Sequence, residues 1–295
     1  MSKILVTGAT GTVGSILVPA LRGRDSKVRA LIHNPDHEGL FAGDDIELAF
    51  ADFADPATLR TALQDVDAVF LACGNVPDQV AYECAVIDEA ARSGVRRIVK
   101  LSARGAAIGS PVAYWDWHGQ IERHLQASGI PSVLLQPGFL MTNLLVAAVQ
   151  IGQGMLFAPA GAARIAMIDP ADVAAAAAVA LTTDEHESQT YVLTGPAAIT
   201  YEQVALDLSA ATGRRVGFVD IPSEAAAAAL IEAGLPPFVA RQVVTVFDQL
   251  RTGVQAETTQ AVQQITGRPA RPFAMFARDH AGAFSAAQAS TAVNA

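Results

Sequence analysis

Short runs of β-branched and aliphatic residues alternate with longer segments of helical periodicity over the first half of the chain. Such alternation is typical of a parallel sheet that is covered by helices on both faces. The pattern predicts six strands, at Lys3–Thr7, Lys27–Ile32, Ile46–Phe50, Ala68–Ala72, Arg97–Leu101 and Ser132–Leu135. It predicts helices between them, at Thr12–Leu21, Pro56–Leu63, Val80–Ser93 and Tyr114–Ala127. We therefore expect a doubly wound α/β fold.

After Pro137 the alternation weakens and helical segments take over. Three helices are predicted between turns that contain proline and glycine, at Ala225–Ala233, Phe238–Arg251 and Thr258–Thr266. The alanine-rich run Ala171–Leu181 is far shorter than the roughly 20 residues that cross a bilayer, so we expect a buried helix there. The expected organisation is an α/β domain over 1–150 with strand and helix additions from about 165–195, a smaller helical substrate or cap region over 196–284, and a flexible tail over 285–295.

Composition narrows the class of protein. Hydrophobic residues make up 51% and charged residues 17%, which indicates an extensive packed interior. The formal net charge of −9 would repel phosphate backbones and anionic membranes, so we expect neither as a partner. Cys73 and Cys84 are too few for a disulfide framework and lack the spacing of a zinc site, so no metal is expected. No export signal is recognisable and a cytoplasmic location is expected. Homo-oligomerisation is left open.

A glycine-rich turn, GATGTVG at Gly8–Gly14, follows the first predicted strand directly and opens a helix. Gly8 permits the tight turn, Gly11 lets the backbone approach a pyrophosphate, and Gly14 lets the helix pack on the strand. The start of the helix offers free N–H groups and a partial positive charge to phosphates. The motif predicts a Rossmann domain for a nicotinamide dinucleotide, with contacts from Gly8, Thr10, Gly11, Thr12, Val13 and Gly14. A glycine-rich turn without a ligand is the alternative, which this context disfavours.

The end of the second predicted strand bears on the choice of cofactor. It lacks the acidic residue that would bind the adenosine ribose hydroxyls, which favours NADP(H) and leaves NAD(H) open. His33 or Arg29 could meet a 2′-phosphate, although Arg29 could equally be a solvated strand residue. His33 and the following Asn34 are therefore candidate cofactor contacts.

Six further motifs occur in order along the chain: ADFADP at Ala51–Pro56, HGQIE at His118–Glu122, SGIP at Ser128–Pro131, QPGF at Gln136–Phe139 followed by Asn143, DPADV at Asp169–Val173, and TGRP at Thr266–Pro269. With the glycine-rich turn, they resemble the NmrA-like branch of the atypical short-chain dehydrogenases/reductases over nearly the whole chain. This family includes quinone oxidoreductases, dye reductases, isoflavone-type reductases, ketoreductases and non-catalytic redox sensors. The chain departs from many relatives at His33 and Gln136, where arginine is usual.

The resemblance implies further cofactor contacts: Asp52 and Phe53 beside the adenine, Ala72, Cys73 and Gly74 after the fourth strand, Ser102 and Ala103 near the nicotinamide, and Pro137 and Phe139 in the QPGF motif. Cys73 is expected to be a small apolar wall rather than a redox centre, because no partner cysteine stands at a CxxC interval. Asn143 is left between two interpretations, the start of a lid helix and a substrate contact.

Candidate catalytic residues are Ser102, Tyr114 and His118. Short-chain reductases commonly place a serine after the fifth strand, and a tyrosine with a lysine four residues later on the next helix. Here His118 stands in the lysine position, on the same helical face as Tyr114. Histidine is charged only part of the time at neutral pH, so it activates tyrosine less than lysine does. The alternative is that Tyr114 only packs the start of the helix with Trp115 and Trp117.

Two functions compete. The leading hypothesis is an NADPH-dependent reductase that passes hydride to a flat, apolar acceptor such as a quinone, an aromatic dye or a polyketide ketone. Its motive is the cofactor motif together with histidine in the lysine position, which suits easily reduced acceptors. The alternative is a non-catalytic NADP redox sensor that acts through a protein partner, suggested by the imperfect Ser-Tyr-Lys pattern.

Overall fold

The computed structural model describes residues 2–41 and 46–285. The chain forms two compact units, which together include all of these residues. The first unit comprises residues 1–137, 170–193 and 261–269, and the second comprises residues 138–169, 194–260 and 270–295.

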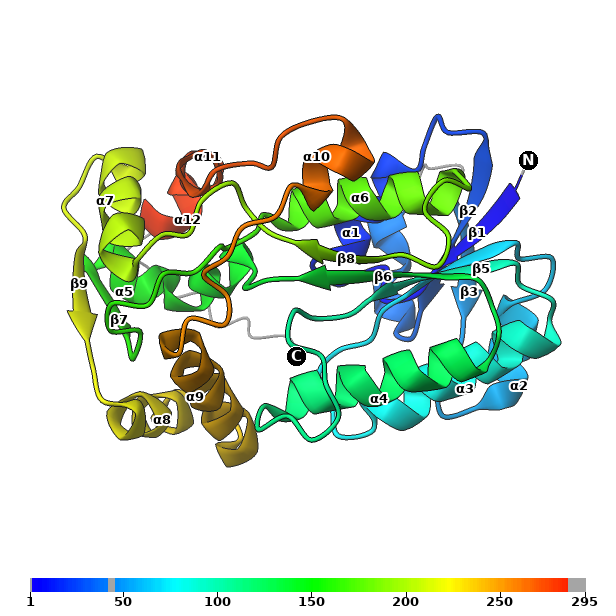
Figure 1. Ribbon diagram of the computed structural model, residues 1–295, viewed down its shortest axis with the longest axis horizontal. Coiled ribbons are helices and arrows are strands. Elements are labelled where there is room, and N and C mark those ends of the chain that lie inside the picture. The colour runs from blue at the N-terminus through cyan, green and yellow to red at the C-terminus, as the bar shows by residue number, and fades with distance from the viewer. Residues whose placement is uncertain (1, 42–45, 286–295) are drawn as a thin grey trace. The chain divides into compact units, whose positions relative to one another are not determined.

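A seven-stranded parallel sheet forms the centre of the first unit (Figure 1). Its strands are β1 Ser2–Val6, β2 Ser26–Ile32, β3 Ile46–Phe50, β4 Ala68–Leu71, β5 Arg97–Leu101, β6 Ser132–Pro137 and β8 Thr190–Leu193. Their order is β3-β2-β1-β4-β5-β6-β8, and every pair is parallel. The order reverses between β1 and β4, which is where ligands bind in doubly wound folds. The predicted doubly wound α/β fold is confirmed.

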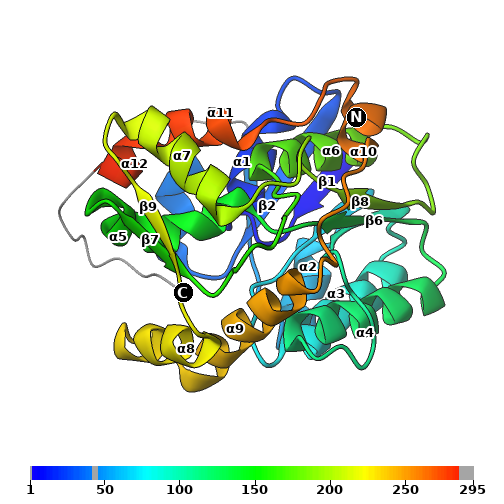
Figure 2. The same ribbon diagram turned by 60° about the vertical axis from the view of Figure 1, so that its left-hand side comes forward.

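Helices cover both faces of this sheet, as Figures 1 and 2 show. One face carries α1 Gly14–Ala20, α6 Pro170–Thr182 and α10 Ala261–Thr266, and the other carries α2 Pro56–Ala62, α3 Gln79–Arg92 and α4 Ala113–Ala127. Asp55 begins α2 as predicted, because its carboxylate accepts the Ala57 N–H at 2.9 Å while Pro56 occupies the first turn. A 3₁₀ helix, η1 Pro35–Phe41, follows β2.

The alanine-rich segment forms α6, which is buried over most of its circumference against the sheet and its neighbouring helices. A helix that is apolar all round must lie inside a protein, and small alanine side chains allow close contact on several sides. On the opposite face of the sheet, an apolar cluster fills the space under α2, α3 and α4, with Leu59, Val69, Val86, Ile98 and Leu125 among its members.

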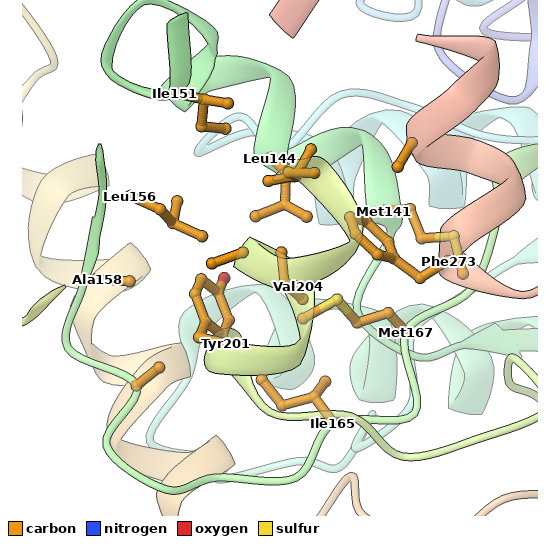
Figure 3. Close-up of a cluster of buried hydrophobic side chains, with 14 of the residues drawn as sticks. Met141, Leu144, Ile151, Leu156, Ala158, Ile165, Met167, Tyr201, Val204 and Phe273 are labelled. Atoms are coloured by element: carbon orange, nitrogen blue, oxygen red, sulfur yellow. The ribbon is translucent and has the colours of Figure 1, made fainter. Parts of the chain in front are cut away.

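The second unit combines helices with a two-stranded parallel sheet, β7 Met155–Ala158 and β9 Gly217–Asp220. The helices are η2 Met141–Ala147, α5 Ala148–Gly152, α7 Tyr201–Thr212, α8 Ser223–Glu232, α9 Pro237–Arg251, α11 Phe273–Asp279 and α12 Ala281–Ser285. Tyr201 lies among the buried apolar side chains that form the core of this unit (Figure 3). Its ring centroid is 5.5 Å from that of Phe218 and 5.7 Å from that of Phe247. The short strand pair has no counterpart among the predicted elements, because four-residue runs carry little periodicity.

The limits of the units differ from the expected residue ranges. Residues 138–150 belong to the second unit, because Met141 and Leu144 pack into its apolar core. Residues 261–269 belong to the first unit, where α10 packs on α6. Of the tail expected at 285–295, Ser285 ends α12 and the remainder lies outside the described residues.

Candidate active site

The glycine-rich turn is built so closely that side chains are excluded from two of its positions. A Cβ on Gly14 would lie 2.1 Å from the carbonyl oxygen of Gly8, so only glycine lets α1 start there. Gly8 has φ +58° and lies against the Ala72 carbonyl, in a backbone region that favours glycine. Thr10 and Thr12 are exposed on the same turn. The turn therefore presents open backbone to a ligand.

Backbone donors at the start of α1 are partly used by the turn itself. The Ser15 N–H donates to the Gly11 carbonyl at 2.9 Å and the Leu17 N–H donates to the Val13 carbonyl at 2.9 Å, so the turn that precedes the helix is the part that can offer N–H groups to a ligand. Val13 precedes the helix without a side-chain cap, and the first N–H groups of any helix lack partners within it. The Gly11 N–H closes the turn by donating to the Gly8 carbonyl at 2.9 Å. This cradle, a turn in which three glycines leave the backbone open and N–H groups lie at the rim, fits a diphosphate.

Thr7 joins β1 to β4 at the point where the strand order reverses. Its Oγ1 accepts the Ala72 N–H at 2.8 Å and lies 2.9 Å from the Ala72 carbonyl oxygen, and the side chain is fully buried. This bond fixes the start of the segment that continues through Cys73 and Gly74. Sequence reasoning missed Thr7, although a hydroxyl between an apolar strand and the first glycine was a usable signal.

Candidate adenosine contacts lie in two exposed turns, one after β2 and one after β3. His33 and Asn34 are both exposed, and the Asn34 Oδ1 accepts the Asp36 N–H at 3.0 Å to begin η1. Asp52 is exposed as well, and its Oδ1 accepts the Ala54 N–H at 2.9 Å. These turns keep polar side chains at the carboxyl ends of the strands.

Arg29 is neither the 2′-phosphate contact nor the solvated strand residue that the sequence suggested. Its guanidinium is buried, where it donates to the Gln64 carbonyl at 2.9 Å and pairs with Glu47 at 2.6 Å. An arginine that is committed to these partners is neither solvated nor free to meet a 2′-phosphate. Of the two residues considered for that role, only His33 is exposed.

Ser102, Gln136 and Glu122 form one hydrogen-bonded group at the ends of β5, β6 and within α4. The Ser102 hydroxyl donates to the Glu122 Oε1 at 2.5 Å, and the Gln136 Nε2 donates to the same oxygen at 2.8 Å. Ser102 is buried, with 3% of its surface exposed. The serine proton is therefore committed to a carboxylate, and the amide of Gln136 supplies a second donor to it.

Tyr114 and His118 share α4 but differ in burial. Tyr114 is half-buried and packs edge-on against Trp117, with ring centroids 5.4 Å apart. Burial raises the pKa of the Tyr114 phenol, which is opposite to the lowering that a neighbouring lysine would cause. The phenol therefore stays protonated at neutral pH, and the packing contact expected for Tyr114 is present.

His118 lies on the buried face of α4, with 8% of its surface exposed. Its Nδ1 is buried and has no hydrogen-bond partner in the part of the chain that the structure describes. Burial, and secondly the positive charge of Lys100, hold the pKa of His118 well below its usual range. The imidazole is therefore neutral at physiological pH, with hydrogen-bonding capacity to spare.

The loop that follows β5 is held tightly on the start of α4. A Cβ on Gly119 would lie 2.6 Å from the carbonyl carbon of Ala107, so glycine is required for this approach. Asp116 accepts the Gly109 N–H at 2.6 Å, which gives its first-turn carboxylate a loop-fixing role. At the other end of the loop, the N–H groups of Ser102 and Arg104 donate to the carbonyls of Leu135 and Pro137 at 2.8 and 2.9 Å, so the loop is held on β6 as well as on α4.

A family model described as "NmrA-like family" matches residues 1–264 of the chain. The chain belongs to the NmrA-like family. The protein is 39% identical over 285 residues to the NAD(P)H azoreductase of Xenophilus azovorans, covering 96% of this chain and 100% of the relative. It is 38% identical over 287 residues to a (4-alkanoyl-5-oxo-2,5-dihydrofuran-3-yl)methyl phosphate reductase of Streptomyces griseus, covering 96% and 99%.

A solved structure with the same fold is that of an NADPH-dependent quinone oxidoreductase from Escherichia coli in complex with NADPH. It superposes on this NmrA-like protein with a TM-score of 0.86 at 30% identity, covering 94% of this chain and 99% of the other. The similarity thus extends over both units.

Most of the predicted site residues of this NmrA-like protein lie at the carboxyl edge of the parallel sheet in the first unit. Pro137 ends β6, whereas Phe139 belongs to the second unit, where its ring lies 5.9 Å from Phe247 and its N–H donates to Gln255. Asn143 is exposed within η2, also in the second unit.

Cys73 is half-buried directly after β4. Burial is the main reason that its pKa is raised to about 11, and the negative charge of Glu83 adds to the effect. The thiol is therefore protonated and unreactive at neutral pH, as expected of an apolar wall.

Within residues 2–41 and 46–285, no group of three His, Cys, Asp or Glu side chains is placed to hold a metal ion. Over the same residues, no helix combines the length and apolarity that crossing a membrane requires.

Proposed function

We propose that this protein is an NADPH-dependent reductase that transfers hydride to a flat, apolar, electron-poor acceptor such as a quinone or an aromatic azo dye. The observation that carries the proposal is the cradle at Gly8–Gly14, in a chain that is 39% identical over almost its full length to an NAD(P)H azoreductase. NADPH is favoured over NADH, because β2 is followed directly by His33 and Asn34 rather than by an acidic residue, and because the quinone oxidoreductase relative was solved with NADPH.

The residues that would hold the cofactor follow the carboxyl edge of the sheet. The diphosphate would rest on the N–H groups of the turn and of the start of α1, with His33 and Asn34 toward the adenosine phosphate and Asp52 and Phe53 toward the adenine. The remaining contacts would come from Ala72, Cys73, Gly74, Ser102, Ala103 and Pro137. When bound, the reduced nicotinamide supplies the hydride.

The chain's own side chains would orient the acceptor. His118, kept neutral by its surroundings, would donate a hydrogen bond to the acceptor atom that gains negative charge, in the way a neutral imidazole serves as an electrophile. Tyr114, a protonated phenol, would donate another. Ser102 would act through Glu122, whose carboxylate it holds together with Gln136.

The relatives widen the acceptor class and disfavour the sensor. The Streptomyces relative is named for reducing a dihydrofuran that carries oxo and alkanoyl groups, so conjugated carbonyl compounds fall within the proposed class. Both curated relatives named above are reductases, and for that reason a non-catalytic sensor is not favoured. We propose that the protein has no nucleic-acid partner, because its net charge of −9 would repel phosphate backbones. We also propose a cytoplasmic location, where its two free cysteines, Cys73 and Cys84, would stay reduced.

The test is a comparison of binding and turnover. Calorimetry with NADPH and NADH should give tighter binding of NADPH, and the loss of NADPH absorbance should accelerate with quinones or azo dyes. Folded protein that binds neither nucleotide would overturn the cofactor assignment. Protein that binds NADPH yet reduces no quinone, dye or conjugated carbonyl compound would contradict the reductase and favour the non-catalytic redox sensor.

A further inference from the structure

Two aromatic side chains of the first unit meet at the carboxyl ends of its strands. Phe53 lies in the turn that follows β3, and Tyr82 lies in the first turn of α3, the helix that follows β4. Their ring centroids are 6.3 Å apart and their planes are inclined at 72°, an edge-to-face contact at a separation that aromatic pairs prefer. The contact therefore joins two elements whose strands are not neighbours in the sheet.

The order of the strands shows what this ring pair borders. In β3-β2-β1-β4, the strands β2 and β1 lie between the two strands that lead to the rings. The glycine-rich turn follows β1, and His33 follows β2. The pair closes from β3 to β4 on the sheet face that α2 and α3 cover side by side, so it lies beside the ends of β2 and β1 (Figures 1 and 2). In dinucleotide-binding folds the adenosine ribose is bound at the end of the second strand, which puts the adenine close to this pair.

Both rings keep part of their surface free. Phe53 and Tyr82 are half-buried, and Phe53 packs against the apolar cluster under α2 and α3. The Tyr82 hydroxyl has no hydrogen-bond partner among the described residues and is not enclosed by them. Residues 74–78, which lead into α3, are exposed. The ring pair is therefore accessible to a flat ligand.

Packing between α2 and α3 does not depend on this pair. Leu59 of α2 and Val86 of α3 belong to the same buried cluster, and Arg60 pairs with the buried Glu89 at 3.2 Å. A half-exposed ring adds little to a core that is already closed, because apolar surface stabilises in proportion to the area removed from water. A purine would bury the surface that remains, since every base can stack on an aromatic ring.

We propose that Tyr82 is an adenine-binding residue of this protein, and that it forms the aromatic part of the adenine site together with Phe53. The inference rests on the proposed function, in which a dinucleotide lies along the carboxyl edge of the sheet. The sequence motifs pointed only to Asp52 and Phe53 for this part of the cofactor, because Tyr82 follows a different strand.

The test measures binding of adenosine 2′,5′-bisphosphate, the adenosine half of NADP without the nicotinamide, by calorimetry. Tyr82→Leu should weaken the binding of both this probe and NADPH about tenfold, the loss expected when a base loses an aromatic partner. Tyr82→Phe keeps the ring and should bind as the unaltered protein does.

Tyr191→Leu is the matched control. Tyr191 is also half-buried and edge-on to another ring, that of His186 at 5.7 Å, but it lies on β8, at the opposite end of the sheet from β3. Its loss should cost stability without changing the affinity for the probe. Equal losses of affinity in Tyr82→Leu and Tyr191→Leu, or full affinity in Tyr82→Leu, would overturn the proposal.

A second measurement does not depend on the folding of a variant. In the unaltered protein with the bisphosphate bound, NMR should show nuclear Overhauser effects between the ring protons of Tyr82 and the adenine H2 or H8. Their absence would contradict the contact. Unaltered protein that binds neither the probe nor NADPH would refute the proposed function itself, whereas normal binding by Tyr82→Leu would refute this inference alone.

Discussion

At the scale of single residues, the site depends on glycines, which have no Cβ, as well as on a carboxylate that accepts two hydrogen bonds. Gly14 and Gly119 both lie against backbone at distances that no Cβ tolerates. Glu122 is the complementary case, a carboxylate on which the donors of Ser102 and Gln136 converge. Both kinds of residue fix the positions of neighbouring backbone and side chains.

Gly14→Ala should abolish cofactor binding. The new Cβ would lie 2.1 Å from the Gly8 carbonyl oxygen, so the turn must open and its N–H groups lose their common direction. Calorimetry with NADPH measures the loss. Gly282→Ala is the control, because its Cβ would meet nothing within 4 Å, and it should bind as the unaltered protein does. Near-normal binding by Gly14→Ala would show that the turn is not the diphosphate site.

Ser102→Ala separates a supporting hydroxyl from a reacting one. Because the hydroxyl donates to Glu122, its loss should destabilise the protein by about 1 kcal/mol in denaturant unfolding. We expect turnover to fall less than about tenfold, whereas removal of a donor to the reacting atom costs about 10²-fold or more. A loss of the larger size would place the Ser102 hydroxyl on the acceptor instead.

At the scale of elements, the loop after β5 and the start of α4 behave as one body. Asp116 holds the Gly109 N–H and also accepts from Gln120 at 2.7 Å, while Gly119 admits the loop backbone. The loop carries Ala103 and leads into Tyr114. Its rigidity therefore determines where the candidate contacts lie.

Asp116→Ala should loosen this loop. We expect faster hydrogen exchange at Gly109, a loss of about 1 kcal/mol of stability and a higher KM for the acceptor with a smaller change in kcat. Asp88→Ala is the matched control. Asp88 lies on α3, and its carboxylate contacts His124 near the other end of α4, away from the loop. Unchanged exchange at Gly109 in Asp116→Ala would contradict the role of this bond.

The sequence predicted helices and strands well wherever a clear hydrophobic periodicity is bounded by capping or turn residues. The predicted strand Ile46–Phe50 has its observed bounds, and α2 starts at Pro56 behind its Asp55 cap. The predicted helix Thr258–Thr266 begins only at Ala261. The strand pair β7–β9 escaped prediction, because four-residue strands leave no clear period.

Predicting the site was harder, because its geometry depends on partners that are distant in sequence. The glycine-rich turn is local, so its constraints follow from spacing alone. Arg29 was misjudged, because its partner Glu47 and the carbonyl of Gln64 reach it only through the folded sheet. Lys100 looks like an ordinary strand residue until α3 brings Glu83 to it.

At the scale of the whole molecule, His118 should leave a signature in acid stability. Its folded-state pKa lies below that of the unfolded chain, near 6.5, so the unfolded state binds more protons between the two values. Stability should therefore fall as pH drops below about 6.5, by up to about 1.4 kcal/mol per pH unit. Denaturant unfolding between pH 7 and pH 5 measures the slope, and His118→Gln should lack this part of it. Identical slopes would show that the imidazole is not buried in neutral form.

A fragment that ends at Pro137 should not fold. It contains six of the seven sheet strands but lacks β8, α6 and α10, so one face of the sheet would lose most of its cover. Exposing that apolar face costs more than the few kcal/mol by which a domain is stable. Circular dichroism during heating should show no cooperative transition, and a sharp transition would mean that these segments are dispensable.

The chain passes between its two units five times, after Pro137, Asp169, Leu193, Gln260 and Pro269. A single recombination junction between the genes of two relatives therefore cannot transfer one whole unit. Each unit of the resulting protein would contain segments from both relatives. A chimaera that inherits an intact second unit needs matched junctions at all five places. We expect recombination within the family to preserve both units together, and new acceptor preferences to arise by point substitution.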